Sequence, residues 1–148
     1  MAEKFVYVTY IRTTPEKLWD ALTKSEFTRA YWFGVTPDCE WKVGSPWKLM
    51  FQDGRVADSG EVLEIDPPRR LVLKWRNEFM PEMKADGYSR CTFDIEQAGE
   101  AVKLTIFHEI DKTGSKFIAG VSEGWPKILA SLKSLLETGK ALERPKSL

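Results

Sequence analysis

The sequence predicts an α+β fold in which a curved antiparallel β-sheet of about six strands wraps around one long C-terminal helix. Apolar and polar residues alternate in successive short segments between residues 47 and 110, which is typical of strands with one solvated face. From about residue 115 to 138, apolar residues recur at spacings of three and four, as in an amphipathic helix. The apolar stripe of this helix needs a partner, and the inner face of the sheet is the surface available to it.

The first elements are a strand and two short helices. Residues 4–12, KFVYVTYIR, are rich in β-branched and aromatic side chains and predict the first strand. Thr14 can cap a helix, Pro15 suits its first position, and Glu16 adds a favourable charge to its first turn. A second short helix is expected over residues 25–31, so that the pair leads from the first strand to the rest of the sheet.

The remaining strands are expected to follow one another as a meander. Turn sequences such as QDG and QAGE separate short alternating segments, and this pattern favours antiparallel hairpins. The five segments are SPWKLMF (45–51), GEVLEID (60–66), RLVLKWR (70–76), SRCTFDIEQ (89–97) and AVKLTIFHEI (101–110).

A Gly-Trp-Pro sequence at residues 124–126 complicates the C-terminal helix. Proline in a helix interior removes a hydrogen bond and clashes with the preceding turn, at a cost of about 3 kcal/mol. Either the regular helix begins near this proline, or a longer helix from Ser115 kinks there. We favour the longer helix, because Phe117, Val121 and Trp125 continue the apolar stripe upstream of the proline.

Composition narrows the class of protein. A chain of 148 residues is expected to form one domain over residues 1–148, with about 141–148 as a frayed tail. Lysine plus arginine equals aspartate plus glutamate at 22 each, which disfavours nucleic acid as a partner. No segment approaches the roughly 20 apolar residues that span a bilayer, and no signal peptide is recognisable, so we expect a cytoplasmic protein without membrane insertion. Cys39 and Cys91 are expected to be free thiols.

Several motifs resemble one known superfamily. TTPEKLWDALTKSEFTRAYWFG (13–34) is similar to the segment that follows the first strand in START-like helix-grip proteins, the SRPBCC or birch-pollen-allergen-like superfamily. EGWPKILASLKSLLETG (123–139) resembles the terminal signature of its branch similar to the activator of heat-shock-protein-90 ATPase. The strand motifs stand in the family's order, so the resemblance covers nearly the whole chain.

This resemblance implies a cavity between the sheet and the C-terminal helix. Across the superfamily such cavities hold lipids, sterols, polyketides and other apolar molecules, so we expect an apolar or aromatic ligand. The superfamily also includes cyclases and co-chaperone domains, and the fold does not choose among them. One alternative is therefore stimulation of a heat-shock-protein-90-type ATPase, with a role in the stress response. Another is a cyclase- or hydrolase-like reaction that uses His108.

The candidate ligand-binding residues are aromatic, sulfur-containing or inward-facing by strand parity. Aromatic side chains dominate both cores and apolar ligand sites, so each has a packing interpretation beside the binding one. His108 is the single histidine and shares the inward face of its strand, where it either contacts ligand or is a hydrogen-bonded core residue. The candidates are Trp32, Phe33, Trp47, Trp75, Met80, Met83, Cys91, Phe93, His108, Val121 and Trp125.

No catalytic constellation is recognisable, and we therefore lean against an enzyme. No serine or cysteine has an identifiable base beside it, and one histidine with two distant cysteines cannot supply the ligands that zinc requires. We accordingly expect no catalytic residue, metal or cofactor. The expected partners are an apolar small molecule or, in the alternative, a chaperone, and the protein is expected to be a monomer or a weak homodimer.

Overall fold

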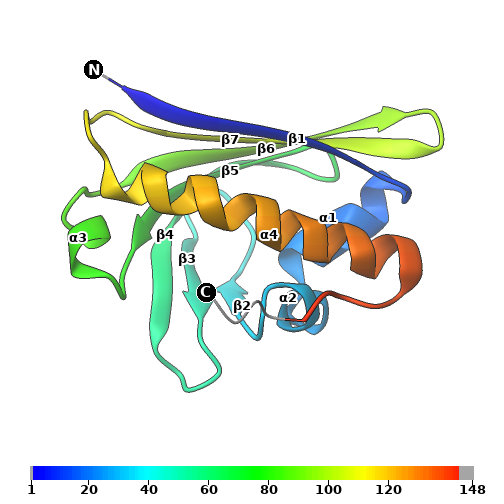
Figure 1. The fold of residues 1–148 in the computed structure, drawn as a ribbon, viewed down its shortest axis with the longest axis horizontal. Helices are drawn as coiled ribbons and strands as arrows, with labels where there is room; N and C mark the ends of the chain where they lie inside the picture. The colour runs from blue at the N-terminus through cyan, green and yellow to red at the C-terminus, as the bar shows by residue number, and fades with distance from the viewer. Residues whose placement is uncertain (1, 144–148) are drawn as a thin grey trace.

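Residues 2–143, which the computed structural model describes, form a seven-stranded antiparallel sheet that curves around helix α4 (Figure 1). The strands are β1 (Glu3–Ile11), β2 (Thr36–Cys39), β3 (Pro46–Met50), β4 (Val56–Asp66), β5 (Arg70–Asn77), β6 (Ser89–Ala98) and β7 (Ala101–Ile110). The helices are α1 (Pro15–Thr23), α2 (Ser25–Tyr31), α3 (Pro81–Lys84) and α4 (Lys116–Thr138). The predicted α+β class and the arrangement of sheet and long helix are confirmed.

The strand order is β1-β7-β6-β5-β4-β3-β2, so the first and last strands lie side by side. Strands β3 to β7 follow the predicted meander, and the short strand β2, which was not predicted, adds a seventh strand at the edge beside β3. Strand β1 pairs with β7 over its whole length, from Glu3 opposite Ile110 to Ile11 opposite Val102. Helices α1 and α2 carry the chain from β1 to the opposite edge of the sheet; α1 begins at Pro15 as predicted, and α2 spans the predicted residues 25–31. The Thr14 side chain accepts a hydrogen bond from Lys17 N at 3.2 Å, which confirms the expected N-cap.

Helix α4 begins near Ser115 and continues through Pro126, which is the longer of the two predicted helices. Ser115 caps its first turn by accepting a hydrogen bond from Ile118 N at 3.0 Å, and Gly139, with φ of 84°, ends it in the left-handed conformation. Pro126 lies inside the helix. Because proline has no N–H, the Ser122 carbonyl cannot receive the hydrogen bond that position 126 would otherwise donate.

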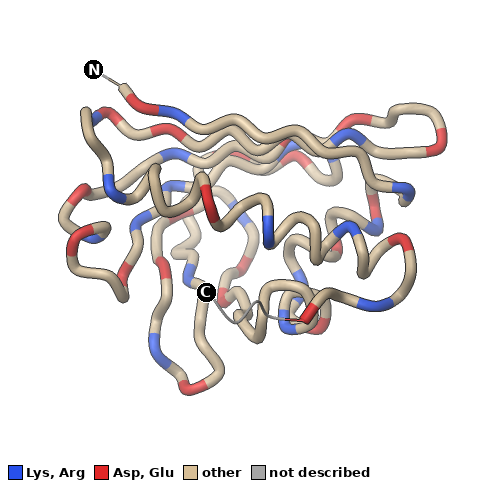
Figure 2. Tube along the Cα trace, viewed as in Figure 1, with Lys and Arg blue, Asp and Glu red and all other residues tan. Residues whose placement is uncertain are grey.

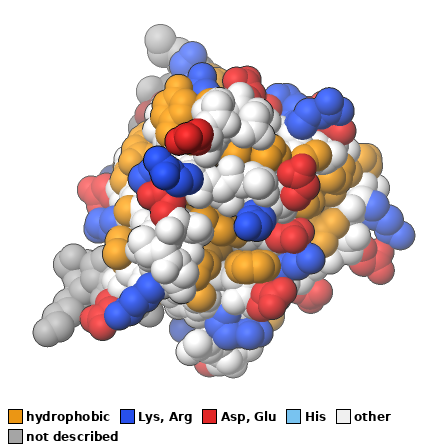
Figure 3. Space-filling model, turned by 90° about the vertical axis from the view of Figure 1, so that its right-hand side faces the viewer, with side chains coloured by type: hydrophobic (Ala, Val, Ile, Leu, Met, Phe, Trp, Pro, Cys, Tyr) orange, Lys and Arg blue, Asp and Glu red, His pale blue; other side chains and the backbone are white. Residues whose placement is uncertain are grey.

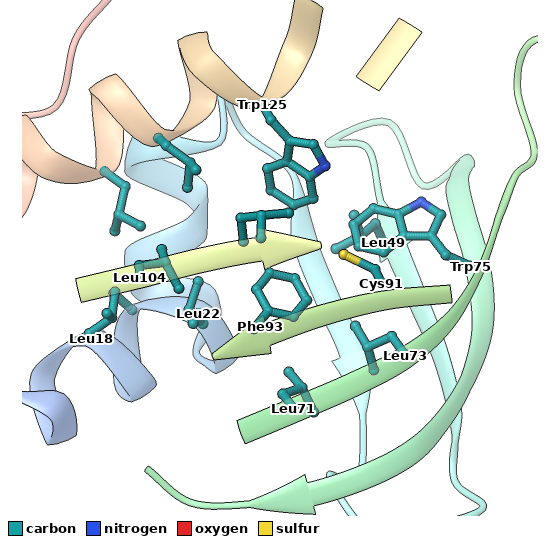
Figure 4. Close-up of a cluster of buried hydrophobic side chains, with 14 of the residues drawn as sticks. Leu18, Leu22, Leu49, Leu71, Leu73, Trp75, Cys91, Phe93, Leu104 and Trp125 are labelled. Atoms are coloured by element: carbon teal, nitrogen blue, oxygen red, sulfur yellow. The ribbon is translucent and has the colours of Figure 1, made fainter. Parts of the chain in front are cut away.

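The core lies between the concave face of the sheet and α4. Figure 4 shows Trp125 extending from α4 toward Phe93 and Trp75 on the strands. The ring centroids of Trp125 and Phe93 are 5.8 Å apart in an edge-to-face arrangement, which is favourable for aromatic pairs. Farther along α4, Leu129 and Leu132 are buried in the same core. In the first half of the helix Trp125 packs against aromatic residues, and the second half contributes aliphatic side chains to the core.

The surface carries both signs of charge. Acidic and basic residues alternate along most of the chain (Figure 2), and hydrophobic patches on one end of the molecule are separated by charged side chains (Figure 3). No helix within residues 2–143 is long and apolar enough to cross a membrane. After α4, Ala141 packs against the core and Leu142 N donates a hydrogen bond to Ser131 Oγ at 3.2 Å. The rest of the predicted tail, residues 144–148, lies outside the described part of the chain.

Candidate functional site

An apolar pocket of about 240 Å³ opens between the first half of α4 and the sheet. The hairpin of β3 and β4, the segment after α2 and the segment after β5 supply the other walls. Its lining residues are Trp32, Val35, Phe51, Ala57, Asp58, Asn77, Phe79, Met83, Phe117, Gly120, Val121, Gly124, Trp125 and Ile128. Twelve of these residues are apolar or glycine, which is the usual character of a site for small molecules with few polar groups.

Small residues on α4 leave this space open. Gly120 and Gly124 lie one helical turn apart on the face toward the pocket. A Cβ atom at Gly124 would meet no atom within 4 Å, and one at Gly120 would meet only the flexible end of Met83. Larger side chains at these positions would therefore fill the pocket.

Tryptophans pack together at the base of the pocket. Trp75 lies between Trp47, with ring centroids 4.4 Å apart, and Trp125, with centroids 5.7 Å apart. Trp32 closes the group, because its ring lies 5.5 Å from that of Trp125. Of these four residues, Trp32 and Trp125 line the pocket, whereas Trp47 and Trp75 are buried beneath it.

A chain of hydrogen bonds fixes the orientation of Trp125. Its Nε1 donates to Nδ1 of His108 at 3.2 Å. Because an indole N–H is only a donor, the proton of the neutral imidazole lies on Nε2, which donates to Ser89 Oγ at 3.0 Å. Ser89 Oγ in turn donates to the Trp75 carbonyl oxygen at 2.8 Å. Burial lowers the pKa of His108 to about 3, so the imidazole stays neutral near pH 7.

Asp58 is the one ionisable side chain among the described residues that line the pocket. It lies opposite Asn77 on β5 and Leu49 on β3. A register shift between β3 and β4 places Ala57 and Asp58 together at the pocket wall. Burial raises the pKa of Asp58 to about 7, against the opposing effect of the Trp75 indole N–H, and the Glu78 carboxylate raises it further.

The predicted ligand-binding residues fall into two groups. Trp32, Met83, Val121 and Trp125 line the pocket. The others do not line it: Trp47, Trp75, Cys91, Phe93 and His108 are buried in the core, Phe33 borders a separate surface hollow with Pro126, and Met80 precedes α3. Cys91 is a free, fully buried thiol whose pKa is raised by burial, as expected of an unreactive cysteine.

Other lining residues were not among the predicted candidates. Asp58 could have been found by extending the alternation of β4 back from the buried Val62 through Gly60. Gly120 and Gly124 could have been found as small residues within the apolar stripe of α4. Phe51 and Asn77 could have been found by continuing the inward alternation of β3 and β5 one step past Leu49 and Trp75, whereas Phe79 lies beyond the end of β5 and carries no such pattern.

The sheet closed by a long C-terminal helix defines the chain as a START-like helix-grip protein of the SRPBCC superfamily. The family model described as "Activator of Hsp90 ATPase homolog 1-like protein" matches residues 12–137, and the chain belongs to this family. The resemblance seen in the sequence is thereby confirmed.

Solved structures with the same fold include three of bacterial or parasite origin. Protein MLL2253 from Mesorhizobium loti is 24% identical, with a TM-score of 0.77 over 90% of this chain and 96% of that one. The Aha1 dimer from Colwellia psychrerythraea is 22% identical, with a TM-score of 0.73 over 94% and 99%. PFC0360w, an HSP90 activator from Plasmodium falciparum, is 21% identical, with a TM-score of 0.73 over 90% and 95%. No curated protein matches the sequence.

Proposed function

We propose that the protein binds a small apolar or aromatic molecule in the pocket between α4 and the sheet. The observation that carries this proposal is the pocket itself: aromatic and aliphatic walls around about 240 Å³, with few polar groups. This volume lies just below the roughly 300–1,000 Å³ of sites for drug-sized ligands. It favours a compact ligand of one or two rings, or the end of a longer lipid- or polyketide-like chain, over a complete sterol.

The construction of the walls supports a binding role. The His108 hydrogen bond holds Trp125 in one orientation at the pocket wall, so this surface is preorganised before any ligand arrives. Met83, in contrast, is a flexible side chain that lies against Gly120 and can adapt to the shape of a ligand.

A thermal-shift experiment tests the proposal. Indane, naphthalene and indole would be added to the purified protein, which would also be examined by native mass spectrometry for a co-purified ligand. A ligand at 100 times its dissociation constant stabilises the folded state by about 2.7 kcal/mol. We expect at least one compound to raise the melting temperature of the wild-type protein.

The matched variants are Gly124→Leu, which places a side chain in the pocket, and Glu123→Leu, which changes the exposed neighbour. Gly124→Leu should abolish the ligand-induced shift, and Glu123→Leu should retain it. Equal shifts in both variants, or no shift and no co-purified ligand in the wild type, would count against the pocket as a binding site.

A second candidate function is stimulation of an HSP90-type ATPase. Membership of the family of activators of Hsp90 ATPase and an exposed apolar surface on strand β1 support it. Val6, Val8 and Tyr10 are 46%, 44% and 51% exposed, and alternate with inward-facing residues along edge strand β1. Exposed apolar rows of this kind are suited to protein contacts. The test measures ATP hydrolysis by the chaperone of the same organism with the wild-type protein and with Val8→Lys. Stimulation by the wild type alone would support this function, and no stimulation would exclude it.

The same pair of proteins tests a weak homodimer. The related Colwellia psychrerythraea protein was solved as a dimer. Light scattering at increasing concentration would reveal self-association of the wild-type chain, which Val8→Lys should weaken if β1 provides the contact. We do not propose catalysis by His108, because both its ring nitrogens are hydrogen-bonded within the core.

A further inference from the structure

The pocket has a polar side that its apolar walls do not explain. Asp58 and Asn77 lie opposite each other on β4 and β5, and both line the pocket. Asn77 is only 5% exposed, and its Oδ1 accepts a hydrogen bond from Met80 N at 2.8 Å. Within residues 2–143, no hydrogen bond or ion pair engages the Asp58 carboxyl group, and none engages the side-chain NH2 of Asn77.

The nearby Trp75 indole does not form a hydrogen bond on this polar side of the pocket. Its Nε1 is buried and has no hydrogen-bond partner among the described residues. It lies close enough to Asp58 to lower the pKa of the carboxyl group, without the geometry of a hydrogen bond. Buried polar groups are normally paired, because leaving one without a partner is destabilising. Asp58 is partly buried and has no hydrogen-bond or ion-pair partner among the described residues, so its carboxyl group is available to a donor on a ligand in the pocket.

The rings around Asp58 define the kind of donor. The pocket is lined by Trp32, Phe51, Phe79, Phe117 and Trp125. The faces of such rings attract cations, and a carboxylate in apolar surroundings needs an opposite charge. We propose that the pocket selects a small apolar amine, whose protonated nitrogen pairs with Asp58 while its hydrocarbon part lies among the aromatic rings. This inference rests on the proposed binding function and specifies its ligand class.

The charges around Asp58 agree with a cationic ligand. Glu78, which follows β5, also acts on Asp58, and its own carboxylate is paired with Arg76 at 2.6 Å and Lys84 at 3.2 Å. On β3 the residue opposite Asp58 is Leu49, and α4 presents Phe117 and the two glycines to the pocket, none of them charged. An anionic ligand would face Asp58 without a compensating cation from the pocket lining.

This pairing makes binding depend on pH. Asp58 alone, with a pKa of about 7, is protonated in part of the molecules near neutrality. An alkyl ammonium group keeps its proton up to about pH 10. Binding of the amine should therefore be strongest between about pH 8 and 9, and weaken by up to roughly tenfold per pH unit as Asp58 becomes protonated below pH 7.

The experiment compares three probes of nearly the same shape: 2-aminoindane, 2-methylindane and indane-2-carboxylate. Dissociation constants would be measured by calorimetry or by NMR titration at pH 8.5 and pH 5.5, for the wild type and for Asp58→Asn. At pH 8.5 we expect the wild type to bind the amine about tenfold or more tightly than the hydrocarbon, since hydrogen bonds to charged groups contribute about 1.5–3 kcal/mol. The carboxylate should bind most weakly.

Asp58→Asn keeps the shape of the side chain and removes its charge. It should abolish the preference for the amine and its pH dependence, while changing the affinity for 2-methylindane by less than about twofold. If amine and hydrocarbon bind the wild type equally, or if the carboxylate binds best, the amine inference is wrong and the pocket proposal stands. If no probe binds the wild type at either pH, both proposals fail.

Discussion

The indole nitrogen of Trp125 donates a hydrogen bond across 3.2 Å to Nδ1 of His108, linking α4 to β7 at the base of the pocket. Trp125 is buried in the core and also lines the pocket, so it has both the packing position and the pocket position that the sequence allowed. The single histidine thus acts on the pocket through Trp125 and does not line it.

Replacing His108 should therefore destabilise the protein and loosen Trp125. His108→Leu leaves the Trp125 N–H and the Ser89 hydroxyl without their buried partner, at about 1–3 kcal/mol for each group left unsatisfied. We expect a lower midpoint of urea unfolding together with a change in tryptophan fluorescence. Glu109→Gln, at the next position of the same strand, serves as the control and should leave both unchanged. An unaltered midpoint in His108→Leu would contradict the role assigned to this hydrogen bond.

Two groups with shifted pKa values, His108 and Asp58, should give opposite contributions to the pH dependence of stability. The pKa of His108 is lowered from 6.5 to about 3, so its contribution to stability is complete above pH 6.5 and is lost as the pH falls toward 3. The pKa of Asp58 is raised from 3.8 to about 7, so its contribution is complete below pH 3.8 and is lost as the pH rises through 7. Between these limits each group changes the unfolding free energy by up to about 1.4 kcal/mol per pH unit, in opposite directions.

The test is a series of urea-unfolding measurements from pH 7 to pH 4. In Asp58→Asn the opposing contribution is absent, and we expect the free energy of unfolding to fall more steeply with acidification than in the wild type. Parallel curves for the two proteins would show that Asp58 does not titrate with a raised pKa.

Gly60 is required where β4 passes between two tryptophans. It pairs with Trp47 on one side and Trp75 on the other, and a Cβ atom there would lie 1.7 Å from the Lys74 carbonyl oxygen. Gly60→Ala should lower the free energy of unfolding by about 3 kcal/mol, because the backbone of β5 must move to accept the methyl group. Gly124→Ala meets no neighbouring atom and should stabilise α4 by up to about 1 kcal/mol. Chemical denaturation of both variants checks the prediction, and equal stabilities would contradict it.

Asp86 anchors the start of α4 from the segment after α3. It is 3% exposed, accepts hydrogen bonds from Ser115 Oγ at 2.8 Å and Phe117 N at 3.0 Å, and pairs with Lys112 at 2.7 Å. Burial would raise its pKa, but the Lys112 ammonium and the hydrogen bonds from Phe117 and Ser115 outweigh burial and lower it to about 2. The stabilisation is therefore present above about pH 4 and is lost as the pH falls toward 2.

Asp86→Ala should accelerate hydrogen exchange in the first turns of α4 near neutral pH. The amides after Pro126 should keep their protection, because those turns are held by Leu129 and Leu132 in the core. Equal acceleration along the whole helix would show that Asp86 stabilises the fold globally and not the first turns of α4.

The sequence was sufficient for most of the fold because its periodicities are strong. Strand alternation, the Thr14 cap and the stripe of α4 predicted elements whose positions the structure confirms. Strand β2 was missed, since the four residues Thr36–Cys39 contain a proline and show no alternation, and they become a strand only by pairing with β3.

The site was less predictable because it depends on spacing between elements. Trp75 and Phe93 face inward, as the alternation predicts, but both are buried in the core and do not line the pocket. Whether an inward side chain lines the pocket depends on how closely α4 packs over it, and the sequence of the strand does not contain that information. Asp58 was missed for a different reason: its polar neighbours resemble a turn, although it keeps the inward parity of Val62 and Gly60 on the same strand.

Pro126 divides α4 into two segments that pack against different parts of the protein. The segment before it, with Gly120 and Gly124, covers the pocket, and the segment after it is embedded in the aliphatic core. Since one hydrogen bond is missing at the junction, the cooperativity of the helix is weakest there. Under the proposed binding function, a ligand would enter and leave when the turns before Pro126 open locally, while the turns after it stay folded.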